Sequence, residues 1–276
     1  MRELRSSDLI RKKNCANRKA LFLEMLTKYL IICPLIFIAG FIDAVAGGGG
    51  LVSLPAYMIT GIPVHNCIAT NKMSSFMGTS VTTAKYARKG FIPWKIGMVC
   101  IPCALAGSSL GAKASLLVPD NILKTILMII IPLTGIYVIT RKGNLETNIT
   151  RSDKAALFIS ALVALFIGAY DGFYGPGTGV FLILLLTCFA GMKLTTANGL
   201  AKVINLSTNI AALVVFLING QVLFPLGVVA GLFNIAGNYI GATCFVQNSS
   251  KIVKPVMVSV LLIFFLKLIL EFCGRV

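Results

Sequence analysis

The chain has 276 residues, of which 57% are hydrophobic and only 12% charged, whereas charged residues make up about 25% of an ordinary water-soluble domain. Its formal charge of +16 is concentrated in the N-terminal residues and in connections between apolar segments. This distribution is typical of cytoplasmic loops and argues against nucleic-acid binding. The sequence therefore predicts an integral membrane protein, with the lipid bilayer as a partner and no nucleic acid.

Residues 1–28 form a basic N-terminal extension that is expected to lie in the cytoplasm. Apolar stretches of about 20 residues follow, each long enough for a membrane-spanning helix. They lie at about 29–60, 66–85, 95–118, 121–140, 155–191, 197–219, 222–246 and 252–273. The expected fold is an all-α, polytopic, multi-pass bundle in the inner (plasma) membrane.

These stretches divide into a first membrane repeat at 29–140, a basic linker at 141–154 and a second membrane repeat at 155–274. If the long segments 29–60 and 155–191 each cross the bilayer once, there are eight crossings and the repeats run parallel. If each crosses twice, there are ten crossings and the repeats are inverted. Positive charges in the connections favour eight crossings, with the tail and the basic loops all inside. An inverted arrangement would suit alternating access.

The two halves of the chain align residue by residue. At an offset of 128, Gly40, Asp43, Gly47 and Gly49 align with Gly168, Asp171, Gly175 and Gly177. At an offset of 130, Gly61, Lys72, Gly90, Gly97, Gly107, Gly111 and Ala112 align with Gly191, Lys202, Gly220, Gly227, Gly237, Gly241 and Ala242. One shift of two residues keeps glycines, an aspartate and a lysine in register, which predicts an internal duplication.

Charged residues inside the apolar segments indicate where a binding site lies. A charge near the bilayer centre costs about 2.5–3.5 kcal/mol, so Asp43, Lys72, Asp171 and Lys202 are expected to face a polar interior or one another. The glycine clusters interrupt the helices and leave backbone N–H groups unpaired. Broken helices at matching positions of two repeats indicate a transporter's substrate site.

Polar side chains accompany both lysines. Lys72, Ser75 and Thr79 share one helical face, and Lys202, Asn205 and Asn209 repeat this spacing. Ammonium groups, hydroxyl and amide donors and half-helix N-termini favour an anion. The expected substrate-binding residues are Asp43, Gly47, Gly48, Gly49, Gly50, Asn71, Lys72, Ser75, Thr79, Asp171, Gly175, Gly177, Thr178, Asn198, Lys202, Asn205 and Asn209.

Alternatives exist for the charged residues. Each lysine could instead extend its ammonium group toward the end of its segment. Each aspartate could cap a broken helix, pair with a lysine of the other half or carry a proton, and capping or ion pairing is the favoured role. His65 has no partner at metal-ligand spacing, so no metal site is expected. The glycine clusters are not followed by the Lys-Ser/Thr of a P-loop, and no cofactor is expected.

The stretches "GFIDAVAGGGGLVSLPAYMITGIPVHNCIATNK", "GAYDGFYGPGTG" and "TTANGLAKVINLSTNIAALVVFLINGQVLFPLG" resemble the sulfite exporter TauE/SafE family, in particular a bacterial branch of membrane transporters. The resemblance covers about residues 30–270. It implies an inner-membrane protein built by duplication of a four-span unit, and export of sulfite, sulfoacetate or related sulfur-containing anions. The family motifs fall on Asp43 with Gly47 to Gly50, Asn71-Lys72, Asp171 with Gly175 and Gly177, and Asn198 with Lys202.

Three classes of function are compatible with the residues. A secondary transporter that exports small anions is favoured over an anion channel, and an integral membrane enzyme or structural subunit comes last. An enzyme would need a nucleophile with a base or a metal cluster, and the chain offers only isolated carboxylates, cysteines and His65. The expected partner is a small anion, and self-association into a homo-oligomer is compatible with the sequence.

Overall fold

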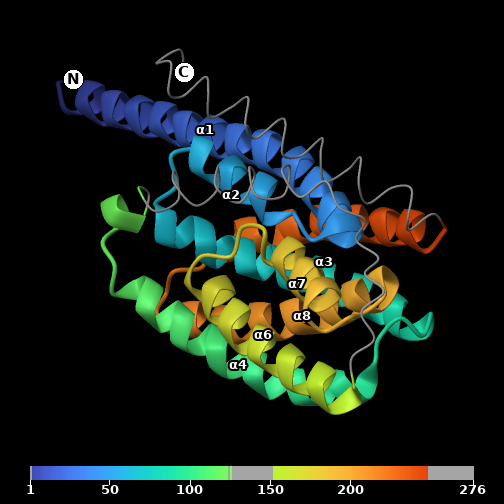
Figure 1. The fold of residues 1–276 in the computed structure, drawn as a ribbon. Coiled ribbons are helices and arrows are strands. Elements are labelled where there is room, and N and C mark those ends of the chain that lie inside the picture. The colour runs from blue at the N-terminus through green and yellow to red at the C-terminus, as the bar shows by residue number, and fades with distance from the viewer. Residues whose placement is uncertain (1, 124, 126–151, 248–276) are drawn as a thin grey trace, which may run out of the picture.

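The computed structural model describes residues 2–123, 125 and 152–247, and these residues form helices and short connections without strands (Figure 1). The helices are α1 (Arg2–Ala46), α2 (Gly50–Ile59), α3 (Val64–Arg88), α4 (Trp94–Leu116), α6 (Asp153–Phe173), α7 (Thr178–Cys188), α8 (Leu194–Ile218) and an unlabelled helix at Phe224–Gln247, here called the 224–247 helix. The expected all-α fold is confirmed. The predicted segments 121–140 and 252–273 and most of the basic linker lie outside the described residues.

Within the described residues, 5 helices are long and apolar enough to cross a membrane. They are Met25–Ala46, Trp94–Leu116, Asp153–Phe173, Leu194–Ile218 and Phe224–Gln247. Their 21 to 25 residues give lengths of about 31–38 Å, which match a hydrocarbon core of about 30 Å. The helix α3 is as long, with 25 residues, but it carries the polar side chains of the candidate site. The fold is that of a multi-pass membrane protein.

The chain reverses direction at both glycine clusters. Gly47, Gly175 and Gly177 have φ angles of 74°, 96° and 77°, a backbone conformation that glycine adopts without strain. As a result, α2 runs back along α1 and α7 runs back along α6 (Figure 1). With 10 and 11 residues, α2 and α7 are only about 15–17 Å long. Each of the two long apolar segments is therefore a hairpin with one long and one short arm.

This reversal returns the chain to the side from which α1 enters. Thr27 and Lys28 of α1 line the same groove as Ile59 and Thr60, just before α3 begins. Lys85 lies at the other end of α3, in its last turn. The N-terminal tail and the basic loop after α3 consequently lie at opposite ends of the helices. This geometry differs from the eight-crossing arrangement, in which residues 29–60 cross the bilayer in one direction and both basic segments lie inside. The cytoplasmic location of the N-terminal extension stays a prediction.

The helices α4 and α6 pack through glycine surfaces that let their backbones touch. A Cβ atom on Gly107 would lie 2.1 Å from the carbonyl oxygen of Leu165, and one on Gly111 would lie 2.0 Å from that of Ala169. Small residues spaced four apart are a common way for membrane helices to approach each other closely. Because both contacts advance by four residues, α4 and α6 run parallel.

The 224–247 helix packs on α1 in the same manner. A Cβ atom on Gly237 would lie 2.0 Å from the carbonyl oxygen of Phe37, and one on Gly241 would lie 2.4 Å from that of Phe41. These two helices therefore also run parallel. Each half of the chain thus contributes its glycine-bearing helix to the first helix of the other half, which interlocks the two halves.

Two of the polar helices, α3 and α8, cross near the middle of the bundle (Figure 1). Gly227 packs against Met73 and Gly231 against Met77, so α3 runs parallel to the 224–247 helix. In Figure 1, α1, α3 and the 224–247 helix run in one direction, and α4, α6 and α8 run in the other. Segments that align between the halves in sequence therefore run in opposite directions, unlike the favoured parallel arrangement and as in the inverted alternative.

Candidate functional site

The turns of the two hairpins meet in the interior of the bundle. A Cβ atom on Gly47 would lie 2.4 Å from the backbone of Gly179, and one on Gly179 would lie 2.4 Å from the Cα atom of Gly47. Any larger residue at this contact would push the hairpins apart. The close contact brings the N-termini of the short helices α2 and α7 next to each other.

A small polar cavity lies at this meeting point. It is lined by Asp43, Gly47, Gly50, Asn71, Lys72, Ser75, Asp171, Gly175, Thr178, Gly179, Asn205 and Asn209. All of these except Gly179 are among the binding residues expected from the sequence. The cavity has room for about one water molecule, so an anion the size of sulfite fits only if the lining residues move.

Each buried lysine pairs with the aspartate of the other half. The Nζ atom of Lys72 lies 2.8 Å from Oδ2 of Asp171, and that of Lys202 lies 2.9 Å from Oδ2 of Asp43. Lys72 and Lys202 are 2% and 0% exposed, so neither ammonium group extends to the end of its helix. The four charges form two neutral pairs, which removes most of the cost of burying them.

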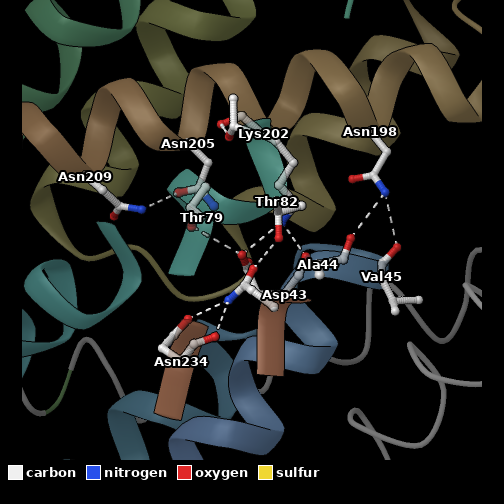
Figure 2. Close-up of polar contacts among 12 residues, drawn as sticks. Asp43, Ala44, Val45, Thr79, Thr82, Asn198, Lys202, Asn205, Asn209 and Asn234 are labelled. Atoms are coloured by element: carbon white, nitrogen blue, oxygen red, sulfur yellow. Dashed lines mark hydrogen bonds and ion pairs between the residues drawn. The ribbon is translucent and has the colours of Figure 1, made fainter. Parts of the chain in front are cut away.

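Lys202 also caps the end of α1 (Figure 2). Its ammonium group donates a hydrogen bond to the main-chain oxygen of Asp43 in addition to the carboxylate. One turn earlier on α8, the Asn198 amide donates to the carbonyl oxygens of Ala44 and Val45, at 3.5 and 3.3 Å. The last carbonyl groups of a helix lack partners within the helix and favour a cation nearby. Lys202 and Asn198 together supply hydrogen-bond donors for the last carbonyl groups of α1.

Tyr86 makes a further hydrogen bond to the end of α1, and its contribution to stability can be tested by substitution. The hydroxyl group of Tyr86 donates to the carbonyl oxygen of Ala44 at 2.8 Å, while its ring packs on Phe91 and Phe245. Tyr86→Phe keeps the ring contacts and removes one buried hydrogen bond, so the free energy of unfolding should fall by about 1 kcal/mol. Thermal unfolding in detergent measures the change. Tyr239→Phe, at a residue that is 58% exposed, should leave the unfolding temperature unchanged.

The second pair is held by a different set of contacts. The hydroxyl oxygen of Thr178 lies 2.7 Å from Oδ1 of Asp171 and also 2.7 Å from the main-chain oxygen of Gly175. In the described part of the chain, the buried side-chain oxygens of Asn71 and Tyr174 have no hydrogen-bond partner. Asn71 lines the cavity, so its side-chain oxygen is a polar atom there that a ligand or a water molecule would satisfy.

Some expected binding residues lie behind the cavity wall. They are Gly48, Gly49, Thr79, Gly177, Asn198 and Lys202. Gly49 packs on α1, where a Cβ atom would lie 2.6 Å from that of Asp43, and Gly177 forms the turn before α7. The hydroxyl group of Thr79 donates to Oδ2 of Asp43 at 3.5 Å. The six residues do not line this cavity, and their part in substrate binding stays a prediction.

Two buried asparagines near the site were not expected from the sequence. The amide of Asn238 donates to Oδ1 of Asn234 at 2.5 Å, and Thr82 donates to Oδ1 of Asn238 at 2.7 Å. Gly40 and Gly78 face them, and a Cβ atom on Gly78 would lie 1.9 Å from Oδ1 of Asn234. The sequence feature that could have indicated them is a pair of amide side chains, four residues apart, inside an apolar run. They link the 224–247 helix to α3 beside Asp43 (Figure 2).

The only histidine lies away from the cavity. The Nδ1 atom of His65 contacts the Asp120 carboxylate, and its Nε2 atom lies 3.0 Å from the main-chain oxygen of Ser115. In the described ranges, no group of three or more His, Cys, Asp or Glu side chains is placed to hold a metal. These contacts join the start of α3 to the end of α4.

Comparison with known proteins decides the family. The model of the sulfite exporter TauE/SafE family matches residues 32–268. The chain belongs to the sulfite exporter TauE/SafE family. It is 36% identical over 225 residues to the "Probable membrane transporter protein ORF9" of a Sinorhizobium species, covering 81% of this chain and 85% of that protein. No solved structure matches the chain.

Other members of the TauE/SafE family show similar coverage. A "Probable membrane transporter protein" of Haemophilus influenzae is 33% identical, over 80% of this chain and 87% of the relative. The "Probable membrane transporter protein YfcA" of Escherichia coli K12 is 30% identical, over 86% of this chain and 88% of the relative. The names of these relatives place the chain in a family of membrane transporters, in agreement with its apolar helices.

Proposed function

We propose that this TauE/SafE family protein is a secondary transporter that exports small anions, sulfur-containing ones such as sulfite or sulfoacetate among them, across the inner membrane. The observation that carries the proposal is the polar cavity where the two hairpins meet. Lys72 supplies a cation there, and the hydroxyl group of Ser75 and the amide group of Asn205 supply donors. The helices α2 and α7 begin at the same cavity, and helix N-termini favour anions.

We also propose that the two halves are inverted repeats that give alternating access. Corresponding segments run in opposite directions, and the hairpins enter from opposite sides of the bundle (Figure 1). Rocking of one half against the other would open the cavity to one side at a time, as in other transporters with inverted repeats. In this arrangement α2 and α7 add no complete crossing of the bilayer. An inside-negative potential would then favour outward movement of an anion.

The first test is anion flux in proteoliposomes. The purified protein should accumulate at least one labelled anion from a panel of sulfite, sulfoacetate, sulfate, thiosulfate and small carboxylates, with saturation and counterflow. The variant with both Lys72→Ala and Lys202→Ala should lose this flux. Normal flux in that double variant would show that the site is elsewhere, and the absence of flux for the whole panel would refute the proposed substrate class.

An anion channel is the second candidate, because it would use the same polar cavity between the hairpins. Because the space holds about one water molecule, an anion passes only after the hairpins separate. A transporter with such a gate saturates and exchanges labelled for unlabelled substrate. Recordings from planar bilayers discriminate the two functions, since unitary current steps without counterflow would identify a channel.

A further inference from the structure

The two ion pairs at the centre of the protein are not equivalent. Lys202 is fully buried, does not line the cavity, and divides its hydrogen bonds between the carboxylate and the main-chain oxygen of Asp43 at the end of α1. Lys72 and Asp171 both line the cavity. Lys202 therefore serves as a fixed helix cap, and Lys72 is the lysine that a ligand in the cavity could reach.

The carboxylate of Asp171 occupies the position on Lys72 that an anion would need. Its Oδ2 atom lies 2.8 Å from the ammonium nitrogen, and the two side chains are each 3% exposed. An ammonium group in such surroundings binds a second anion only when the first one gives way, because two negative charges beside one positive charge are not compensated. Asp171 therefore competes with the substrate anion for the ammonium group of Lys72.

Thr178 provides a hydrogen bond to Asp171 in either protonation state. Its hydroxyl oxygen is 2.7 Å from Oδ1 of Asp171 and 2.7 Å from the Gly175 carbonyl oxygen, and a hydroxyl group has one hydrogen to donate. When the hydroxyl donates to Asp171, it stabilises the carboxylate. When it donates to Gly175, its oxygen is free to accept a hydrogen bond from a protonated Asp171.

We propose that the substrate anion displaces Asp171 from Lys72 and that Asp171 takes up one proton as it is displaced. The proton comes from the aqueous phase on the side where the anion enters, and an O–H bond forms on the Asp171 carboxylate while the Lys72 ammonium group keeps its charge. When the anion leaves on the other side, this O–H bond breaks, the proton enters the aqueous phase there, and the carboxylate pairs with Lys72 again. This inference rests on the proposed transport function and adds its coupling. For a divalent anion, one net negative charge still moves with each anion, so an inside-negative potential continues to favour export.

The other charged groups at the centre keep their partners in this proposal, and Asp43, which also lines the cavity, adds to the negative charge near Lys72. Asp43 at the end of α1 keeps Lys202 of α8 as its partner, and the two remain neutral together. Tyr174, which follows α6 and comes three residues after Asp171, carries a titratable hydroxyl group that is buried and has no hydrogen-bond partner among the described residues. Among the described residues that line the cavity, Asp171 is therefore the carboxylate that loses its counter-charge when an anion binds Lys72.

The test is calorimetric titration of the full-length protein in detergent with sulfoacetate, which is fully ionised at pH 7 and neither brings nor removes a proton. Titrations in buffers of different ionisation enthalpy give the number of protons taken up per anion. We expect about one proton for the wild-type protein. Asp171→Asn should take up none and bind sulfoacetate about tenfold more tightly or better, because the competitor is gone.

Two further variants control the measurement. Lys72→Gln in the Asp171→Asn background should abolish sulfoacetate binding, which assigns the anion to Lys72. Asp120→Asn makes the same chemical change at the aspartate beside His65, away from the cavity, and should retain the wild-type affinity and proton count.

Each outcome decides between the two proposals. Wild-type binding and flux without proton uptake would refute the exchange at Asp171 and leave the transport function standing, and this result needs no variant to fold. If Asp171→Asn binds sulfoacetate but the wild-type protein transports no anion of the panel, the Lys72 site is supported and the transport function is refuted. Failure of both the wild-type protein and Asp171→Asn to bind sulfoacetate, or equal affinity in the two, would overturn the inference.

Discussion

Lys202→Ala is expected to lower the free energy of unfolding by about 3–5 kcal/mol, the usual cost of removing one partner from a buried ion pair. The substitution leaves the Asp43 carboxylate uncompensated inside the bundle and removes a donor from the end of α1. Unfolding of the purified protein in mixed micelles, followed by circular dichroism against denaturant or temperature, measures the loss.

The matched control removes both charges of this pair. In the double variant Lys202→Ala with Asp43→Ala, no unpaired charge remains, so part of the lost stability should return. A double variant that is less stable than Lys202→Ala alone would show that Asp43 stabilises the fold through contacts other than Lys202. Wild-type stability of Lys202→Ala would contradict its role as a helix cap.

Substitution at the contact between the hairpin turns should lower the stability about as much as Lys202→Ala. Gly179→Ala places a Cβ atom 2.4 Å from the Cα atom of Gly47, with backbone on both sides, so the hairpins must move apart. We expect a loss of about 3 kcal/mol or more and the loss of anion flux. Gly47→Ala adds the cost of a side chain at a φ of 74°, about 1–2 kcal/mol, to the same clash.

Gly61 provides a control that separates the steric clash from the cost of a side chain at a positive φ. It has a φ of 75°, similar to that of Gly47, but a Cβ atom there meets nothing within 4 Å. Gly61→Ala should therefore lose only about 1–2 kcal/mol and keep its flux. Flux and unfolding temperature are measured on the same preparations. If Gly179→Ala behaves like Gly61→Ala, the close approach of the hairpins is not needed for transport.

The position of the candidate site could be predicted from the sequence because membrane burial of charge is so costly. Asp43 and Lys72 recur in register as Asp171 and Lys202, and four such charges are tolerated in apolar segments only if they meet. Their meeting at one place, with the glycine clusters beside them, follows from that requirement. The pairing of each lysine with the other half's aspartate was one of the alternatives that the residues left open.

The direction of the chain after the glycines could not be predicted in this way. A glycine cluster in an apolar run permits either a straight interruption or a reversal, and hydrophobicity is the same in both cases. The difference between the two lysines was also hidden, because they occupy equivalent sequence positions. It arises from a neighbour, since Asn198 caps α1 beside Lys202, whereas Ile68 occupies the position that aligns with Asn198 in the first half.

The exchange of partners between the halves has a consequence for biosynthesis. Lys202 and Asp43 are 159 residues apart, which at about 5–20 residues per second is a delay of about 8–30 s between their syntheses. During that interval the first half holds Asp43 in the membrane without the partner that it has in the finished protein, and Lys72 lacks its own partner until Asp171 is made. Nascent chains that end before Asn198 lack both side chains of α8 that contact the end of α1, so this helix end depends on a segment made much later.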